Sequence, residues 1–132
     1  NKVYLLSRSK SKIAIVDYVT KGLLQEFDVP KTPVDMTVYK DDLFVLGGRS
    51  NKIMVINTKD DVVTAQIDLN PNGFATSIYQ LKGTHLAIIT DTKIGKYYVF
   101  DMNKKKIIKT NNLLVPVSKM VVVEKKYGSS NK

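Results

Sequence analysis

The sequence has 132 residues, of which 43% are hydrophobic, which is enough to bury a core and excludes a largely disordered chain. It contains no cysteine, which excludes disulfides, zinc–thiolate sites and cysteine nucleophiles. Its net charge of +9 attracts anionic partners, or else keeps the surface soluble. No run of about eighteen apolar residues is present and the first residues lack the apolar stretch of a signal peptide, so the sequence predicts no membrane span.

Short strands follow one another from the N-terminus. The first four are brief runs rich in β-branched and aromatic side chains, bounded by polar turns and without a helical period. They cover residues 3–7, 12–17, 23–29 and 34–39. The first two of these strands are almost wholly apolar, which is expected where both faces of a sheet are covered by neighbouring sheets.

The same order of strands returns twice along the chain. The second set covers residues 43–47, 52–57, 62–69 and 75–79, and the third covers 86–90, 96–101, 106–114 and 118–123. Three groups recur 40 and then 44 positions apart, namely Asp17, Asn57 and Asp101; Asp28, Asp68 and Asn112; and Met36, Thr76 and Met120. The pattern therefore predicts one segment, 1–132, of three repeats at about 2–41, 42–84 and 85–124, with a flexible tail at 125–132.

The Asp or Asn that ends the second strand of each repeat has a predicted mechanical role. The short side chain of Asp17, Asn57 or Asp101 can accept a hydrogen bond from the backbone N–H two residues further on, which closes the next turn. Because these residues recur once per repeat rather than in a cluster, we interpret them as turn formers and expect no metal site.

The repeats resemble those of the YVTN family of β-propeller proteins, relatives of the WD repeat, over residues 2–124. The likeness lies in the order of an apolar strand, a polar turn, a strand such as KIAIVD, KIMVIN or KYYVFD, an outer strand, a Pro- or Gly-containing loop and an inner strand. Four-stranded repeats of about forty residues are typical of propeller blades. The resemblance implies an all-β fold of three such blades.

Three blades are fewer than the roughly four that known closed propellers need. We therefore expect an arc of a larger propeller, with the remaining blades supplied by the same chain or by another copy. Two alternatives stay open at this point: the assembly of arcs into a ring, and a β-sandwich that is not a propeller.

The sequence indicates no catalytic residue and no cofactor. The stretch LGGRSNK at 46–52 has adjacent glycines, but it lies at a hairpin rather than at the start of a helix, so we interpret it as a glycine-permissive turn and not as a phosphate-binding loop. His85 is the single histidine, and we expect it at the surface or at a strand edge. Aromatic residues such as Tyr97 and Tyr98 lie within strands, where packing is the expected role.

Basic residues recur at the turn between the first two strands of each repeat, which in a propeller lies on the same face as the loops that enter the inner strands. We take this basic rim as the candidate binding site, or else as a device for solubility. It consists of Arg8, Lys10, Lys12, Lys31, Arg49, Lys52, Lys93 and Lys96.

These observations predict a non-catalytic scaffold that binds another macromolecule, a protein above all, with nucleic acid or another anionic partner as an alternative. The resemblance leaves open a competing function, because relatives range from interaction platforms to propeller enzymes and periplasmic respiratory accessory proteins. The sequence does not fix the compartment, and we favour the cytoplasm or nucleus over the periplasm.

Overall fold

The computed structural model describes residues 1–113, 121 and 123 and contains eleven β-strands in that part of the chain. The strands are β1 (Lys2–Ser7), β2 (Lys12–Asp17), β3 (Gly22–Asp28), β4 (Pro33–Tyr39), β5 (Asp42–Gly47), β6 (Lys52–Asn57), β7 (Val62–Asp68), β8 (Ala75–Gln80), β9 (Leu86–Asp91), β10 (Lys96–Asp101) and β11 (Lys106–Asn112). All of them lie within a residue or two of the strands that the sequence predicts. Among the described residues, no helix is long and apolar enough to cross a membrane.

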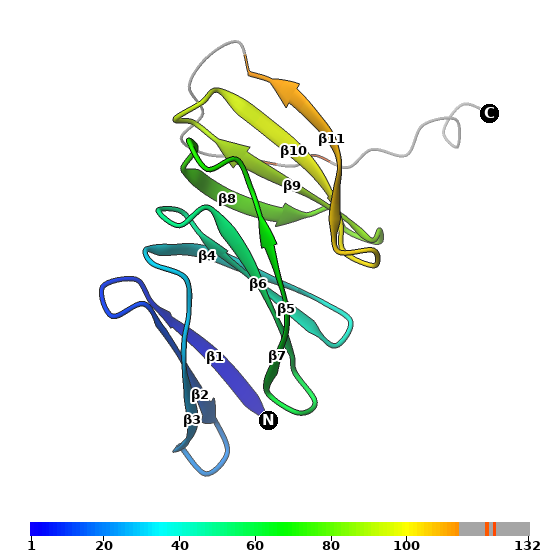
Figure 1. Ribbon diagram of the computed structural model, residues 1–132. Helices are drawn as coiled ribbons and strands as arrows, with labels where there is room; N and C mark the ends of the chain where they lie inside the picture. The colour runs from blue at the N-terminus through cyan, green and yellow to red at the C-terminus, as the bar shows by residue number, and fades with distance from the viewer. Residues whose placement is uncertain (114–120, 122, 124–132) are drawn as a thin grey trace, which may run out of the picture.

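The strands form three antiparallel sheets that are stacked side by side (Figure 1). The first sheet has the order β1-β2-β3, the second β4-β5-β6-β7 and the third β8-β9-β10-β11. In each four-stranded sheet, the strand that ends one repeat pairs with the first strand of the next repeat, and β4 lies beside β8. The first sheet has three strands in the described part of the chain, and the edge of β1 is left without a partner strand there. The predicted strand at 118–123, except for Val121 and Val123, and the predicted tail at 125–132 lie outside the described residues.

The inner strands of the second and third sheets follow a slightly different spacing from the one that the sequence suggests. Met36 lies opposite Val45, and Ile78 lies opposite Ile89, so Met36 corresponds in space to Ile78 rather than to Thr76. The physical reason is a loop of different length, since residues 69–74 connect β7 to β8 whereas only residues 29–32 connect β3 to β4.

Two apolar layers hold the three sheets together, and the second sheet contributes to both. On one face, Leu43 and Val45 pack in a cluster with Ile13 and Ile15 of the first sheet. Its other face carries Phe44, which meets Phe100 of the third sheet edge to face at 5.5 Å between ring centroids. The predicted two-sided burial of these apolar strands is confirmed here, and each buried aromatic or aliphatic side chain contributes on the order of 1.5–3 kcal/mol.

The turns that follow β2, β6 and β10 are built as the sequence predicts. Oδ1 of Asp17 accepts hydrogen bonds from the backbone N–H groups two and three residues on, at 2.8 and 3.2 Å. Asn57 makes the same pair of contacts at 2.9 and 3.2 Å, and Asp101 makes them at 2.9 and 2.9 Å. Each of these turns ends on a residue with positive φ: Lys21, Asp61 and Lys105.

The glycines of LGGRSNK serve close packing rather than an unusual backbone. A Cβ at Gly47 would lie 2.6 Å from Cβ of Pro30, and one at Gly48 would lie 2.6 Å from the ring of Phe74. The left-handed residue of this turn is Asn51, with φ of 50°. The predicted turn is therefore present, but its glycines provide space for neighbouring loops and its positive φ falls on an asparagine, a residue that tolerates this region.

A buried polar cluster connects the second sheet to the third at the same end of the molecule. The Asn51 side chain, 2% exposed, accepts a hydrogen bond from the Ala75 N–H at 2.9 Å and donates to the Asn70 carbonyl and to the Asp91 carboxylate. Asp91 is fully buried and accepts from the Phe74 N–H at 3.0 Å. A buried carboxylate is tolerated only when its oxygens are hydrogen-bonded, and these contacts meet that need.

Gly73 is the residue that makes room for this cluster, and its replacement tests the cluster's importance. A Cβ at position 73 would lie 2.0 Å from Oδ2 of Asp91 and 2.6 Å from Nδ2 of Asn51. We expect Gly73→Ala to lower the free energy of unfolding in urea by about 1–3 kcal/mol, the usual cost of overpacking. Gly22→Ala is the matched control, because its Cβ would make an ordinary 3.6 Å contact with Thr20. Equal losses in both variants would contradict this role of Gly73.

Candidate functional site: a basic hairpin face

The stacked sheets have two ends that differ in the loops they carry. We call one end the hairpin face. It carries the turns β1–β2, β5–β6 and β9–β10 and the connections β3–β4 and β7–β8, and it lies on the left in Figure 1. The remaining turns lie at the other end, the turn face. Backbone hydrogen bonds fix the loops of the hairpin face to one another, for example from Val29 to Ser11 at 3.0 Å and from Leu69 to Asn51 at 2.9 Å.

All eight residues of the predicted basic rim lie at this hairpin face, but they fall into two groups. Three of them, Lys12, Lys52 and Lys96, begin the second strand of their repeat and reach the end of the third strand. Their ammonium groups lie 2.8 Å from Asp28, 3.4 Å from Asp68 and 2.8 Å from Asn112, respectively. The hydrogen bond to Asp28 raises the pKa of Lys12. Each of these three lysines therefore contacts a side chain of its own sheet, and the three do not form one continuous rim with the other five residues.

The other five rim residues project from the hairpins and loops. Each is exposed, and none forms an ion pair with another described residue. They are Arg8, Lys10, Lys31, Arg49 and Lys93. We call these five residues the free cation set.

The acidic side chains at the strand ends of the hairpin face are already engaged. Asp28 and Asp68 pair with lysines, as described above, and Asp91 accepts hydrogen bonds from the backbone N–H groups of Lys93 and Ile94 at 3.1 and 3.3 Å. Burial, followed by the charge of Asp91, raises the pKa of Tyr98 beneath this face. The charge that the hairpin face offers to solvent is therefore positive.

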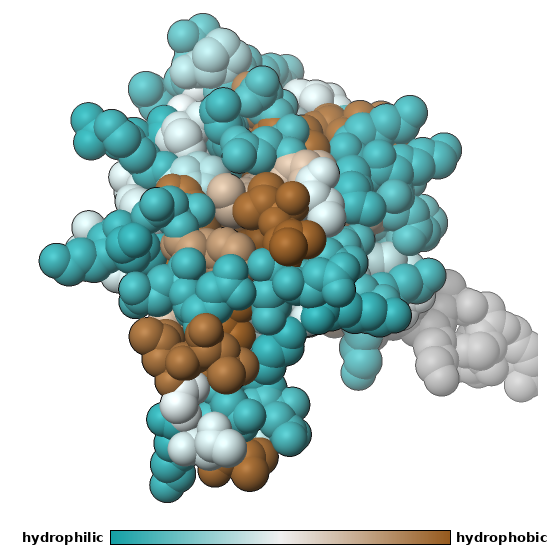
Figure 2. Space-filling view, turned by 60° about the horizontal axis from the view of Figure 1, so that its bottom comes forward, coloured by the Kyte–Doolittle hydropathy of each residue, from teal (hydrophilic) through white to brown (hydrophobic). Residues whose placement is uncertain are grey.

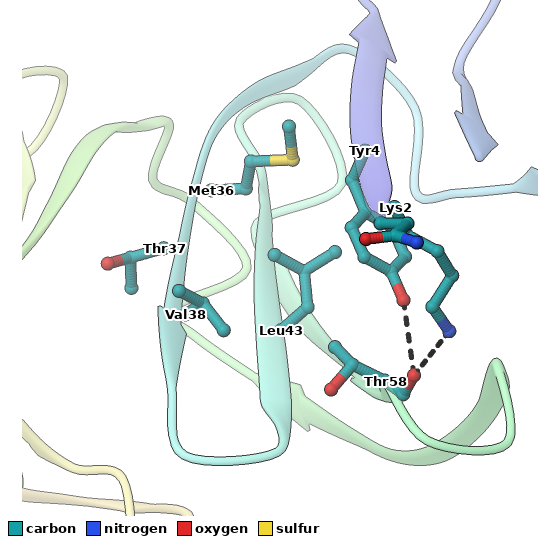
Figure 3. A pocket seen from close by; sticks show the side chains of 8 residues that line it. Lys2, Tyr4, Met36, Thr37, Val38, Leu43 and Thr58 are labelled. Carbon is teal, nitrogen blue, oxygen red and sulfur yellow. Dashed lines mark hydrogen bonds between the residues drawn. The ribbon is translucent and has the colours of Figure 1, made fainter. Parts of the chain in front are cut away.

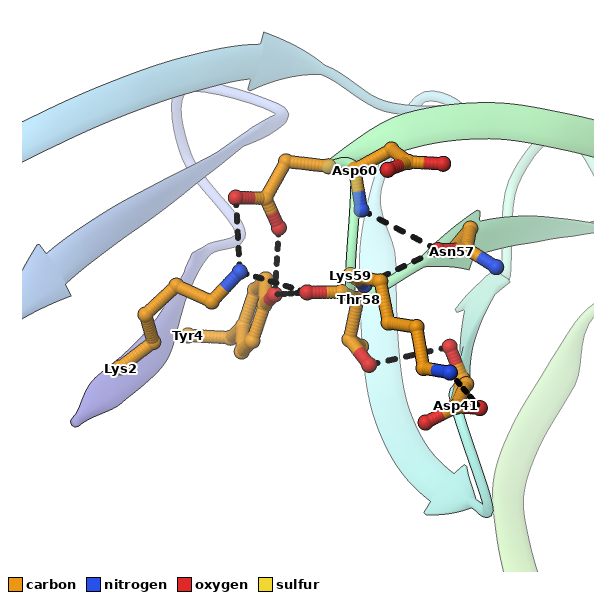
Figure 4. Close-up of polar contacts among 8 residues, drawn as sticks. Lys2, Tyr4, Asp41, Asn57, Thr58, Lys59 and Asp60 are labelled. Carbon is orange, nitrogen blue, oxygen red and sulfur yellow. Dashed lines mark hydrogen bonds and ion pairs between the residues drawn. The ribbon is translucent and has the colours of Figure 1, made fainter.

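The turn face has a different electrostatic character, because acids and bases alternate there (Figure 4). Lys2 and the Tyr4 hydroxyl both contact the Asp61 carboxylate, with Lys2 at 2.9 Å. The hydrogen bond with Asp61 is the main reason that the pKa of Lys2 is raised. Further ion pairs join Lys59 to Asp41 at 3.4 Å and Lys105 to Asp42 at 3.2 Å. Three acidic side chains of this face are thus paired with lysines, and further exposed lysines, among them Lys21, Lys40 and Lys104, lie around them.

His85 lies at the turn face with 46% of its side chain exposed, in agreement with the predicted surface position. Its Nε2 lies 3.6 Å from Oδ2 of Asp101. The Lys104 backbone N–H is the main group that lowers the pKa of Asp101, followed by the Asn103 N–H and the charge of His85. Oδ1 of Asp101 accepts the hydrogen bonds that close the turn, so the carboxylate has a structural role, and His85 lies next to it.

The inner strands hold polar groups that bind each other. Oδ2 of Asp35 on β4 accepts a hydrogen bond from the Ile78 N–H on β8 at 3.0 Å, which joins the two inner strands. Hydroxyl groups of Thr76 and Ser77 contact Thr90 at 2.9 and 2.6 Å. Within the described residues, no group of three His, Cys, Asp or Glu side chains is placed to hold a metal ion.

A pocket of about 670 Å³ opens between β1 and β4 (Figure 3). The second sheet contributes Met36, Thr37, Val38 and Leu43 to its wall, and the first sheet contributes the side chains of Lys2 and Tyr4. Lys2 and Tyr4 both point to the Thr58 carbonyl, which they bind. The sequence gives no signal for this pocket, because it arises from the stacking of two sheets beside an open strand edge.

No model of a protein family and no curated protein matches the sequence. Solved structures do match it in fold. Sqt1 from Saccharomyces cerevisiae superimposes with a TM-score of 0.79 at 12% identity, over 100% of this chain and 37% of that one. Hydrazine synthase from Kuenenia stuttgartiensis gives 0.78 at 14% identity, over 89% and 34%. The RRP9 WD40 repeats give 0.71 at 12% identity, over 83% and 34%.

The three sheets are β-propeller blades. The predicted fold class and the predicted likeness to WD-type repeats are thereby confirmed at the level of the fold, and the β-sandwich alternative is wrong. The chain spans about a third of the length of each of these solved structures. Similar structures include both a WD40 protein and an enzyme, so the fold alone does not decide between a scaffold and a catalyst.

The role of Asp101 can be tested by acidification. Its pKa lies below the ordinary carboxyl value in the folded chain, so its contribution to stability is present above about pH 4 and is lost as the pH falls through the folded pKa. Asp101→Asn should keep the turn, because Asn57 forms the same turn in the second repeat. We expect the difference in free energy of unfolding between the wild type and Asp101→Asn to shrink as the pH is lowered from 7 to 2.5.

Asp101→Ala serves as the comparison, since it leaves the two turn N–H groups without an acceptor. It should lower the free energy of unfolding at pH 7 more than Asp101→Asn does. If the difference in free energy of unfolding between wild type and Asp101→Asn stayed constant across the pH range, the ionised form of Asp101 would not stabilise this turn.

Proposed function

We propose that the chain is a non-catalytic propeller scaffold whose hairpin face binds an acidic segment of another protein. The observation that carries the proposal is the free cation set: five exposed cations supplied by hairpins and loops of all three sheets, on a face where the acids at the strand ends are engaged. A positive surface of this kind steers anionic partners toward it and fixes their orientation.

A protein segment fits this face better than single-stranded nucleic acid does. Binding of single strands depends on exposed aromatic rings that stack on the bases beside the cations. In the described part of the hairpin face, Phe74 is half-buried and packs beside Gly48, while Tyr98 is 5% exposed. Tyr97, near the start of β10, is half-buried as well, so among the described residues of this face no fully exposed ring lies beside the free cation set.

The competing proposal, a propeller enzyme, has less support from the described residues. The likeness to hydrazine synthase concerns the fold, at 14% identity. The most suggestive pair, His85 and Asp101, lies on the turn face, and the carboxylate forms a turn that recurs in every repeat. A general base needs a carboxylate partner that orients the imidazole closely, and 3.6 Å is longer than a hydrogen bond.

Charge reversal on the two faces tests the proposal. The first variant replaces the free cation set, Arg8, Lys10, Lys31, Arg49 and Lys93, with Glu. The control variant replaces five exposed lysines of the turn face, Lys21, Lys40, Lys82, Lys104 and Lys106, with Glu. Both variants undergo the same change of net charge, so a difference between them reports on the face rather than on total charge.

Binding is measured by fluorescence anisotropy with a labelled oligoglutamate peptide and, separately, with a single-stranded RNA oligonucleotide. We expect the first variant to bind oligoglutamate at least about tenfold more weakly, because five exposed charge contacts of about 0.2–1 kcal/mol each are lost. The control should change by less than about threefold, and rising salt should weaken wild-type binding.

Three outcomes would overturn the proposal. Equal losses in both variants would mean that bulk charge attracts the peptide. No loss in either would leave the free cation set as a solubility feature. Tighter binding of RNA than of oligoglutamate at the same salt, lost in the first variant alone, would assign the face to nucleic acid.

A further inference from the structure

A pocket of about 330 Å³ opens between the first and second sheets at the hairpin face. The end of β3 and the connection from β3 to β4 form one side of it, with Val29 and Pro30. The second sheet forms the other side, with Met54 on β6 and Gln66 on β7. Ligand pockets have volumes of about 300–1,000 Å³, so this pocket is at the small end of the range and suits a single side chain.

The inner part of this pocket is apolar. Val29 and Met54 are 8% and 6% exposed and belong to the apolar layer between the first and second sheets. The two charged residues that line the pocket, Asp28 and Lys52, each pair with an oppositely charged residue of their own sheet. An anion inside the pocket would lie beside the Asp28 carboxylate, which repels it. An apolar side chain is therefore the occupant that these walls favour.

The corresponding place between the second and third sheets is filled by a larger side chain. Tyr98 of β10 stands 44 positions after Met54 of β6, which is the spacing between these two repeats. Tyr98 is 5% exposed and packs in the apolar cluster that joins the second and third sheets. The blade therefore accepts an aromatic ring at this position. The methionine between the first two sheets leaves a space that the fold itself does not require.

Two members of the free cation set stand beside the pocket. Lys31 and Arg49 directly adjoin residues that line it, and both side chains are exposed. The two loops that carry them are in contact, because the Gly48 N–H donates a hydrogen bond to the Thr32 carbonyl at 2.9 Å. The opening of the pocket is thus flanked by positive charge from both sheets.

Charge and apolar surface make different contributions to binding. Exposed charge pairs contribute little affinity one by one, whereas a side chain that fills a pocket carries much of the binding energy of an interface. The side of the molecule shown in Figure 2 is mostly hydrophilic and has hydrophobic residues in small separate patches. A partner segment with both acidic and apolar side chains fits such a surface better than a uniformly acidic one.

We propose that the acidic segment bound by the hairpin face carries one apolar side chain of the size of leucine, which enters the pocket beside Met54. Acidic residues before and after it in the segment contact Lys31 and Arg49. This inference rests on the function proposed above, since the cations must first bind an acidic segment. It adds the residue by which the hairpin face distinguishes one acidic segment from another.

Two labelled peptides of equal charge test the pocket on the whole chain by fluorescence anisotropy. One peptide has five glutamates, a leucine and five further glutamates, and the other has serine in place of the leucine. We expect the wild type to bind the leucine peptide at least about tenfold more tightly, because the leucine side chain leaves water for an apolar pocket. A variant with Lys31→Glu and Arg49→Glu should bind both peptides more weakly, because both carry the same charge.

Filling the pocket should remove the preference for leucine. Met54→Phe places a ring where the next blade has Tyr98, so we expect the two peptides to bind this variant within about twofold of each other, with the serine peptide bound as tightly as by the wild type. Met36→Phe is the matched control. It is the same substitution in the same sheet, but Met36 lines the pocket of about 670 Å³ instead. The control should keep the preference for leucine.

A measurement on the wild type decides the matter if Met54→Phe fails to fold by circular dichroism. Methyl groups of isotope-labelled methionines are observed by NMR while each peptide is added. The Met54 signal should shift with the leucine peptide and not with the serine peptide. The signal of Met102, which is 0% exposed, should stay unchanged with both.

Three results would overturn the inference. Equal affinity of the wild type for the two peptides would mean that no apolar side chain enters the pocket, while the function proposed for the hairpin face would stand. A preference for leucine that survives in Met54→Phe, or that is lost in Met36→Phe, would assign the apolar side chain to another place. A wild type that binds neither peptide would overturn the proposed function itself, and this inference with it.

Discussion

Every blade of this chain has two apolar faces, and the rest of the structure follows from the need to cover both. In the second sheet both faces are covered, since Phe44 and Val45 point in opposite directions and both are fully buried. A sheet of this kind cannot be stable alone in water, because leaving one face open exposes several large side chains at roughly 25 cal/mol per Å². Stacking is therefore obligatory, and it extends until a ring closes or another surface takes over. Val3 and Leu5, on the outer face of the first sheet, are 38% and 52% exposed and show the opposite case, in which no second sheet covers the face.

Polar contacts decide how the blades are aligned once apolar burial has stacked them. Burial has little directionality, so it does not by itself fix the height of one blade relative to the next. The Asn51–Asp91 cluster fixes it at the hairpin face, the Asp35 contact with β8 fixes it along the inner strands, and the Lys2–Asp61 pair fixes the first two blades at the turn face. Each contact joins two different sheets, and the cluster around Asp91 is closed to solvent, so it tolerates no added atom at Gly73.

The sequence predicts the parts of this structure that depend on local pattern. Strand positions follow from β-branched runs between polar turns, and the Asx turns at Asp17, Asn57 and Asp101 follow from a short acceptor at a fixed place in each repeat. The blade-to-blade contacts could not be predicted, because the residue types at equivalent positions change: Lys2 pairs with Asp61, whereas the next blades carry Asp42 and Lys105 at these positions. Asn51 occupies the position of Ser11 and Gly95, so nothing in the pattern marks it as a partner of Asp91. The pairing of Lys12 with Asp28 could have been predicted, because every repeat has a lysine at the start of its second strand and an Asp or Asn at the end of its third. It divides the predicted rim into three lysines with a partner in their own sheet and five residues without an ion pair.

This division of the rim residues into two groups defines the candidate site more narrowly. A lysine at the start of the second strand contacts a side chain at the end of the adjacent strand in every repeat, an aspartate in the first two repeats and an asparagine in the third. A cation in the hairpin has no such partner among the described residues, because the hairpin extends beyond the last paired residues of both strands. Each of the three hairpins carries such a cation, namely Arg8, Arg49 and Lys93, although Arg8 lies one position earlier in its repeat than the other two. Stability of the blade does not require a cation at the tip of a hairpin, since a small polar residue would close the turn as well. The recurrence of exposed cations where the fold does not need them is the observation on which the proposed binding role of this face rests.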